Sequence, residues 1–157
     1  MTRPVNGYPH HGQHNRPVPH LGLERKGLDL MTSPAAIPAP SAVRRRVGVV
    51  GAGRVGAVLA AALRAAGHTV VSAHGLSDDS RRRAADLLPG VPLEPVAAVV
   101  ERADLLLLAV PDDTLPGLVQ GVARHGGFRP GQVVAHTSGR HGVTVLAPAA
   151  ELGAVTM

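Results

Sequence analysis

The sequence predicts an α/β domain built on a doubly wound parallel sheet. From Arg46 onward, short apolar segments rich in β-branched residues alternate with segments of helix-forming residues, and this alternation indicates parallel strands joined by helices. Segment 105–110 is apolar without any polar alternation, as is typical of a strand covered on both faces. A glycine triplet within 51–56 directly follows the first predicted strand, where sheets of this class bind their ligands.

Six strands are expected from the apolar segments, at 47–50, 69–73, 91–93, 105–110, 132–136 and 154–156. The first helix is expected over 55–66, because strong helix formers lead to Gly67 as a stop signal. Ser77 is predicted to cap the second helix, whose first turn carries Asp78 and Asp79 at the positive end of the helix dipole. That helix is expected to end near Pro89.

Three further helices follow from similar signals. Pro95 opens the third helix, and Asp112 or Asp113 is predicted to cap the fourth, which ends at the two glycines 126–127. A fifth helix is expected over 142–152, with an interruption at Pro148.

The N-terminal part of the chain has a different composition. Residues 1–43 hold seven of the 14 prolines and four of the nine histidines and show no periodicity, so we expect a disordered tail ahead of a domain at 44–157. The histidines within 10–14 are interpreted as solvated and not as a metal site, since no frame fixes their geometry. Met31 begins a segment that looks like an ordinary protein start, so residues 1–30 are interpreted as the product of an upstream start codon.

Composition narrows the classes of function. A formal charge of +5 and a pI near 11.2 favour an anionic ligand, but an aromatic content of 1% leaves almost no rings on which bases could stack. The arginines cluster at 44–46 and 81–83 and not along one face, so nucleic acid is not the expected partner, and 44–46 is interpreted as the polar entry to the first strand. The chain has no cysteine, and segment 105–111 is far shorter than the ~20 residues of a membrane span. We expect a cytoplasmic protein that binds neither membranes nor a Cys-based metal.

The glycine triplet predicts a dinucleotide site. It follows a strand, opens a helix and lies in a βαβ unit, which is the context that gives the pattern meaning. In this interpretation Gly51 makes the tight turn, Gly53 lets the backbone approach a diphosphate, and Gly56 lets the helix pack against the strand. Free amides and the helix dipole would hold the diphosphate. The predicted loop comprises Gly51, Ala52, Gly53, Arg54, Val55 and Gly56.

The choice of dinucleotide depends on the end of the second strand. NAD sites carry an acidic residue about 20 residues beyond the glycines, and segment 71–77 contains none. Ser77, Arg81 and Arg82 follow, and a guanidinium can clamp a 2′-phosphate with two charge-assisted hydrogen bonds. NADP is therefore favoured over NAD. Arg81, nearest the helix start, is the first candidate and Arg82 the second.

Two further loops end predicted strands at the same edge of the sheet. One is the loop at 110–113, where Pro111 would end its strand without an amide hydrogen and expose a flat apolar wall suited to a nicotinamide ring, although helix capping is the simpler role for Asp112 and Asp113. Thr137, Ser138 and Gly139 follow the next strand, and the hydroxyls of Thr137 and Ser138 could face a nicotinamide amide or a substrate. His136 could donate a proton, although a structural role is more usual at a strand end. No catalytic residue is assigned.

The quoted segments 47–68, 77–92, 103–113 and 131–142 together resemble a known group: Rossmann-like oxidoreductases of actinobacteria that carry a C-terminal helical domain of unknown function. The arrangement is more distantly similar to pyrroline-5-carboxylate reductases, deazaflavin-dependent NADP reductases, and 6-phosphogluconate and 3-hydroxyisobutyrate dehydrogenases. The resemblance implies NAD(P)-linked hydride transfer to a small carbonyl or imine. It also implies that the glycine loop holds diphosphate and that 77–82 holds the ribose phosphate. By the same resemblance, Val110, Pro111 and Asp112 flank the nicotinamide, and 137–139 lies near the substrate.

The resemblance also implies that a second, helical domain forms the dimer and completes the active site. Such a domain does not follow residue 157 in this sequence, so we expect the chain to be a fragment that binds NADP(H) weakly and is inactive alone. A free-standing module, a regulatory nucleotide-binding domain of the potassium-transport type and a binding-only pseudoenzyme are the alternatives. The absence of an acid at the end of the second strand counts against the regulatory domain.

Overall fold

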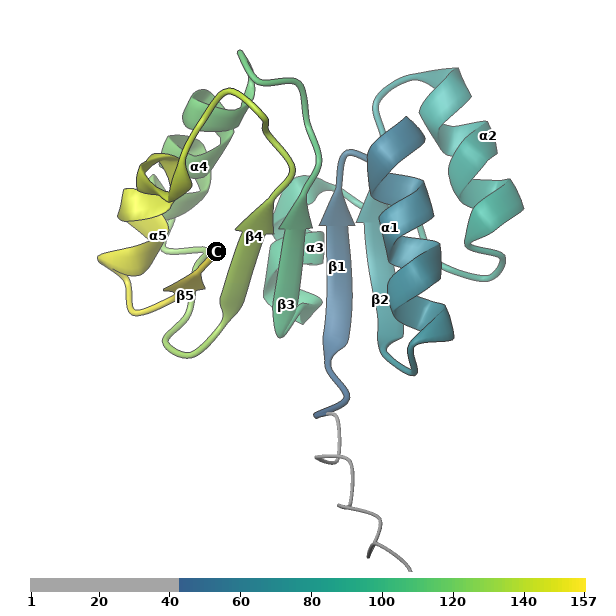
Figure 1. Ribbon diagram of the computed structural model, residues 1–157, viewed down its shortest axis with the longest axis horizontal. Coiled ribbons are helices and arrows are strands. Elements are labelled where there is room, and N and C mark those ends of the chain that lie inside the picture. Colours follow the sequence, from purple (N-terminus) through teal and green to yellow (C-terminus); the bar gives the residue numbers. More distant parts are fainter. Residues whose placement is uncertain (1–42) are drawn as a thin grey trace, which may run out of the picture. The chain divides into compact units, whose positions relative to one another are not determined.

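A computed structural model describes residues 43–157, in which helices flank a single parallel sheet (Figure 1). The expectations for residues 1–42, including the tail and its histidines, lie outside the described residues. The strands are β1 (Arg46–Val50), β2 (Thr69–His74), β3 (Leu105–Leu108), β4 (Val133–His136) and β5 (Val155–Thr156). Their order in the sheet is β2-β1-β3-β4-β5, and all pairs are parallel. The predicted doubly wound parallel sheet is confirmed.

The helices are α1 (Arg54–Ala65), α2 (Asp78–Leu87), α3 (Val96–Arg102), α4 (Leu115–Arg124), the 3-10 helix η1 (Val143–Leu146) and α5 (Ala147–Ala150). Figure 1 shows α1 and α2 at the β2 end of the sheet and α4 and α5 at the opposite end. Alternate residues of β3 enter two separate cores. Leu107 packs with residues of α1 and α2, whereas Leu106 and Leu108 pack with residues of α3, α4 and α5. The unbroken apolar sequence of β3 therefore reflects burial on both faces.

The prediction of a strand at 91–93 is wrong. This segment makes only an isolated bridge, between Leu93 and Ala73. The amide of Ala73 donates to the carbonyl of Pro92 at 3.0 Å, and the amide of Glu94 donates to the carbonyl of Ala73 at 2.9 Å. Pro92 has no amide hydrogen to continue the ladder toward the start of β2, and Pro95 is already the N-cap of α3, so the sheet has five strands in the described residues.

Two predicted helix signals also need correction. Neither Asp112 nor Asp113 caps α4, because the N-cap residue is Thr114, which makes no side-chain capping bond. The single helix expected over 142–152 is a 3-10 turn followed by the four-residue α5, and Pro148 lies in the first turn of α5, where a missing amide costs nothing. The strand expected to reach Val110 ends at Leu108. The next residue, Ala109, lies against Gly51 of the glycine loop.

Other predicted helix ends are confirmed. Ser77 caps α2, with its Oγ accepting from the amide of Ser80 at 3.1 Å, and Asp78 and Asp79 occupy the first turn. Gly67 follows α1 with a φ of +95°, a conformation that glycine adopts without strain.

Candidate cofactor-binding edge

The carboxyl ends of β1, β2, β3 and β4 meet at one edge of the sheet, where the arrowheads lie in Figure 1. Val50 is the register partner of both His74 and Leu108, and Leu108 is the partner of His136. These four residues thus form one row across four strands. Because strand order reverses beside β1, this edge is the switch point at which open α/β sheets bind ligands.

The three glycines of the loop after β1 have different surroundings. Gly51 has a φ of +96°, and a Cβ there would lie 2.4 Å from the carbonyl oxygen of Ala109. A Cβ on Gly56 would lie 2.1 Å from the carbonyl oxygen of Gly51. Both positions need glycine for the fold itself. A Cβ on Gly53 would meet no atom within 4 Å, so the described residues give no packing reason for glycine at this position.

The amides of the same loop divide into two groups. Those of Gly51 and Ala52 both donate to the carbonyl oxygen of His74, at 3.0 and 2.8 Å. The first hydrogen bond of α1 runs from Ala57 to the carbonyl of Gly53 at 3.1 Å. Between these, the amides of residues 53–56 have no acceptor among residues 43–157. They lie at the N-terminus of a 12-residue helix with no acid in its first turn, an arrangement that attracts anions.

The two candidate arginines of α2 lie in different places. Nε of Arg81 approaches the carbonyl oxygen of Gly75 at 3.5 Å, directly after β2, and its guanidinium lies 3.7 Å from Asp78. Arg82 pairs with Asp79, and both line a shallow hollow with three other residues of α2: Arg83, Asp86 and Leu87. Arg81 is therefore the arginine that the structure brings to the end of β2. The Oγ of Ser77 nearby is used as the helix cap.

The loops after β3 and β4 are joined to each other. Arg140 pairs with Asp113 at 2.9 Å, and Nε2 of His141 lies 3.0 Å from the carbonyl oxygen of Asp112. Ser138 holds the second loop together, because its Oγ accepts from the amides of Arg140 at 3.2 Å and His141 at 3.1 Å. The Asp113 carboxylate and the Asp112 backbone carbonyl thus join the two loops, and neither carboxylate caps α4.

The predicted residues of these loops occupy the same edge as the glycine loop. The amide of Ala109 donates to the carbonyl of Val50 at 2.8 Å, which holds the start of the segment containing Val110 and Pro111 against β1. The amide of Thr137 donates to the carbonyl of Leu108 at 3.1 Å, which holds the segment through Gly139 against β3. His136 accepts at Nδ1 from the amide of Ser138 at 3.1 Å, so its ring proton is on Nε2.

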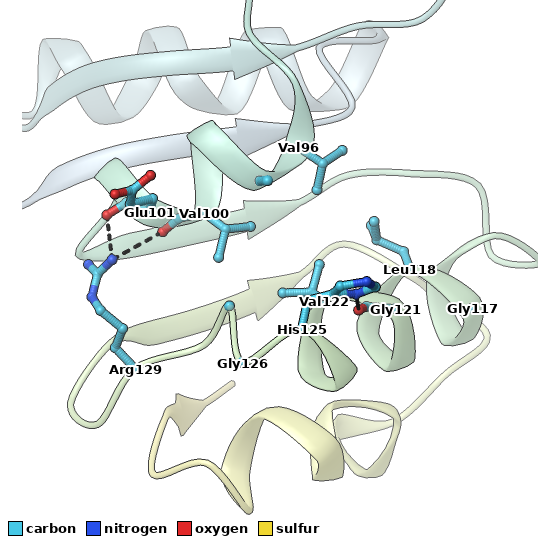
Figure 2. A pocket seen from close by; sticks show the side chains of 12 residues that line it. Val96, Val100, Glu101, Gly117, Leu118, Gly121, Val122, His125, Gly126 and Arg129 are labelled. Atoms are coloured by element: carbon cyan, nitrogen blue, oxygen red, sulfur yellow. Dashed lines mark hydrogen bonds between the residues drawn. The ribbon is translucent and has the colours of Figure 1, made fainter.

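A cavity of about 640 Å³ lies elsewhere, between α3 and α4 (Figure 2). Its wall is mainly apolar, with Val96, Val100, Leu118 and Val122, and its rim carries Glu101, His125 and Arg129. It contains none of the residues predicted to bind a cofactor. Gly117 and Gly121 line this cavity, and a Cβ at either position would meet no atom within 4 Å. The space between the helices is therefore open partly because these two residues have no side chains.

Sequence reasoning missed the role of His74. The second strand was expected to end at Ala73, whereas β2 continues to His74, whose carbonyl receives both amides of the glycine turn. The signal that could have found it is its spacing, since it lies about 20 residues beyond the glycines, where dinucleotide folds contact the ribose.

Comparison with known proteins agrees with this geometry. The family profile described as a Rossmann-like domain matches residues 31–157. The chain belongs to the Rossmann-like domain family. No curated protein matches it. Among solved structures, this Rossmann-like domain is similar to a Bacteroides fragilis protein assigned as an NADP oxidoreductase, at 25% identity and a TM-score of 0.55, over 65% of this chain and 39% of that one.

Two further structures show the same fold. The 3-hydroxyisobutyrate dehydrogenase of Mycobacterium tuberculosis has 24% identity and a TM-score of 0.60, over 72% of this chain and 39% of that one. An imine reductase variant from Myxococcus stipitatus, in complex with NAD⁺, has 22% identity and a TM-score of 0.58, over 72% of this chain and 39% of that one. The Rossmann-like domain thus spans well under half the length of these relatives. Within residues 43–157, no helix has both the length and the apolar character of a membrane span.

Proposed function

We propose that this Rossmann-like domain binds NADP(H) as the cofactor domain of an oxidoreductase. The observation that carries the proposal is the loop at Gly53: four amides without acceptors surround a position at which even a Cβ would meet open space. A diphosphate needs both features, close approach to the backbone and several N–H donors. The neighbouring glycines 51 and 56 are explained by packing alone, so Gly53 is the one that indicates a ligand.

NADP is proposed over NAD on the chemistry at the end of β2. The last residue of β2, His74, and the residues that follow it, 75–77, carry no carboxylate to bond ribose hydroxyls. Arg81 lies beside Gly75 in this segment. Its side chain is 58% exposed, and its guanidinium lies 3.7 Å from Asp78, beyond hydrogen-bonding distance. A 2′-phosphate could therefore replace Asp78 as its partner. Arg82 is the secondary candidate, because its guanidinium is directed to Asp79.

The remaining edge residues receive roles from their positions. Val110, Pro111 and Asp112 would flank the nicotinamide, and Thr137, Ser138 and Gly139 would lie beside the substrate. The bound cofactor would supply the hydride, and this chain's residues would orient it and hold its charge. The substrate class proposed is a small carbonyl or imine compound, in keeping with the dehydrogenase and imine reductase among the similar structures.

The whole protein's activity requires more than this domain. Since the similar oxidoreductases extend well beyond the matched portion, we propose that a further domain completes the substrate pocket and forms a homodimer. The isolated domain is then expected to bind NADP(H) without turnover. No nucleic-acid or membrane partner is proposed.

Isothermal titration of the protein with NADPH, NADH and adenosine tests the proposal. NADPH is expected to bind more tightly than the other two ligands. Arg81→Ala should weaken NADPH by about 1.5–3 kcal/mol, the range for hydrogen bonds to charged groups, and leave NADH nearly unchanged. Arg124→Ala, in the last turn of α4 at the opposite edge of the sheet, is the matched control. NADH or adenosine binding as tightly as NADPH would refute the phosphate clamp.

A further inference from the structure

His74 has a ring whose orientation and proton position are both determined. Its backbone carbonyl supports the glycine turn through Gly51 and Ala52, so the residue cannot move independently of the loop. Its Nδ1 lies 2.9 Å from the carbonyl oxygen of Glu94. Because a carbonyl only accepts hydrogen bonds, Nδ1 must carry a proton. Nε2 is therefore the ring atom that gains or loses a proton.

Nε2 of His74 is free to meet a ligand. Among residues 43–157, no polar group forms a hydrogen bond with Nε2. Because Nε2 is also absent from the fully buried atoms without a partner, it is accessible at the surface. His74 ends β2 at the carboxyl edge, in the row that includes Val50 beside the glycine loop. This position is where the ribose of a dinucleotide is recognised in the fold.

The charged groups around His74 leave it without an anionic partner. On the segment before α3, Oε1 of Glu94 is paired with Arg102 at 3.2 Å, whereas Oε2 is buried and bonds no group of the described residues, His74 included. On the side of α2, Arg81 adds a positive charge and Asp78 is its partner. The neighbouring strand β1 contributes Val50, which is apolar. A ligand anion would thus be the partner of both the imidazole and the Arg81 guanidinium.

We propose that His74 is a specificity-determining residue that binds the 2′-phosphate of the cofactor as an imidazolium, so that NADP(H) binding takes up a proton at Nε2. This inference rests on the proposed function and adds a residue and a proton to it. A neutral Nε2 can only accept, which suits the 2′-hydroxyl of NAD(H). A phosphate presents acceptor oxygens, so it needs Nε2–H, and its negative charge favours the protonated ring.

The decisive measurement is proton uptake on binding. Titration of the protein with NADPH, in two buffers of different ionisation enthalpy, is repeated from about pH 5 to about pH 8, the range in which histidine charge changes. The 2′-phosphate itself titrates near pH 6, so the baseline is His74→Asn, whose amide can still donate to Glu94 but cannot titrate. Wild-type affinity for NADPH should rise with falling pH more steeply than that of the variant, by up to tenfold per pH unit, the limit for one proton.

Controls separate this inference from the proposed function. NADH should show the same proton uptake in wild type and His74→Asn, and His125→Asn, at the far end of α4, should behave as wild type. If His74→Asn does not fold, His74→Gln and the NMR signal of the wild-type ring replace it: the ring should become an imidazolium with NADPH and not with NADH. Equal proton uptake in wild type and variant, or an imidazolium with both cofactors, overturns the inference. Failure of the wild type to bind either dinucleotide overturns the proposed function instead.

Discussion

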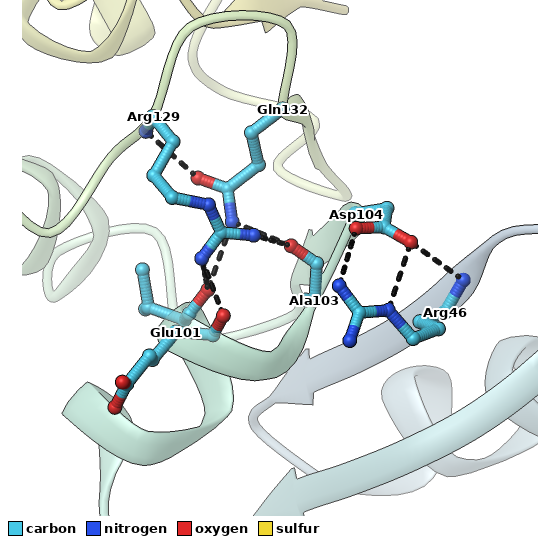
Figure 3. Close-up of polar contacts among 7 residues, drawn as sticks. Arg46, Glu101, Ala103, Asp104, Arg129 and Gln132 are labelled. Carbon is cyan, nitrogen blue, oxygen red and sulfur yellow. Dashed lines mark hydrogen bonds and ion pairs between the residues drawn. The ribbon is translucent and has the colours of Figure 1, made fainter.

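The side-chain amide of Gln132 donates a hydrogen bond of 2.8 Å to the carbonyl oxygen of Ala103, directly after α3 (Figure 3). The same amide reaches the carbonyl of Val100 at 2.8 Å, and the guanidinium of Arg129 also donates to Ala103 at 2.8 Å. Gln132 is 3% exposed, so these groups have no water to replace a lost partner. The two side chains together close the C-terminus of α3.

Replacing Gln132 by Leu should therefore destabilise the domain. The carbonyls of Val100 and Ala103 would lose a buried donor, and each unsatisfied group costs about 1–3 kcal/mol. We expect the lower end of that range, because Arg129 still donates to Ala103 at 2.8 Å and approaches the carbonyl of Val100 at 3.5 Å. Urea unfolding followed by circular dichroism measures the change. Gln120→Leu, on the exposed face of α4, is the control. An equal loss of stability in both variants would contradict the role of the Gln132 hydrogen bonds at the end of α3.

The ion pair of Arg46 and Asp104 predicts a dependence of stability on pH. Hydrogen bonds from the Arg46 side chain hold the pKa of Asp104 below its usual range. Since the folded pKa is the lower one, the contribution is complete above the unfolded value of about 3.9 and is lost as pH falls through the folded value. The Asp104 side chain is 39% exposed, so solvent screens the pair and the effect should be small. Asp104→Asn should lower the thermal midpoint at pH 7, and its difference from wild type should shrink below about pH 4; a difference independent of pH would argue for loss of packing instead.

Substitutions at the glycine loop should separate folding from binding. Gly56→Ala places a methyl group 2.1 Å from a backbone oxygen, and such overpacking typically costs 1–3 kcal/mol. Gly53→Ala meets no atom, so the domain should unfold within about 1 kcal/mol of wild type, the scale of an N-cap change. The same methyl group occupies the space proposed for the diphosphate and should weaken NADPH and NADH alike, by tenfold or more on the scale of one lost charged hydrogen bond. Unchanged affinity of a folded Gly53→Ala would remove the main support for the site.

Two glycines in α4 offer a test of the cavity between α3 and α4. Gly117 and Gly121 have helical backbones and face open space, so neither is required by conformation or crowding. Alanine at either position should raise stability by roughly 0.5–1 kcal/mol, because glycine is costly inside a helix. Thermal unfolding of the single variants and of the pair measures this. A loss of stability would mean that the helix layer closes over the cavity in solution.

Much of the fold could be predicted because its signals are local. The unbroken apolar residues of β3 and the cap at Ser77 depend on neighbours in the sequence, and the structure confirms both. The prediction of a strand at 91–93 failed because Pro92 has no amide hydrogen to continue the ladder and because α3 begins directly after Pro95. The capping role expected of Asp113 failed because Arg140, distant in the sequence, binds that carboxylate.

In the candidate site, too, the local features could be predicted from the sequence, whereas the contacts between side chains could not. The glycine loop was predictable from spacing, but only the three-dimensional structure reveals that Gly51 and Gly56 are needed for packing and that Gly53 is not. The contacts of Arg81 and Arg82 depend on which aspartate each guanidinium reaches, and adjacent helix positions point about 100° apart. The role of His74 was hidden because its carbonyl, and not its side chain, receives the loop amides.

The short connection at 92–94 has a consequence for solubility. An open strand edge is a template on which another chain can pair and begin to aggregate. The Pro92 and Glu94 backbone covers the hydrogen-bonding groups of Ala73, which belong to the half of β2 next to the glycine loop. Another chain could pair with this half of β2 only after displacing segment 92–94, which directly precedes α3. Segment 92–94, which was expected to be a strand, therefore protects this edge of the sheet from intermolecular pairing, at the end where the cofactor is proposed to bind.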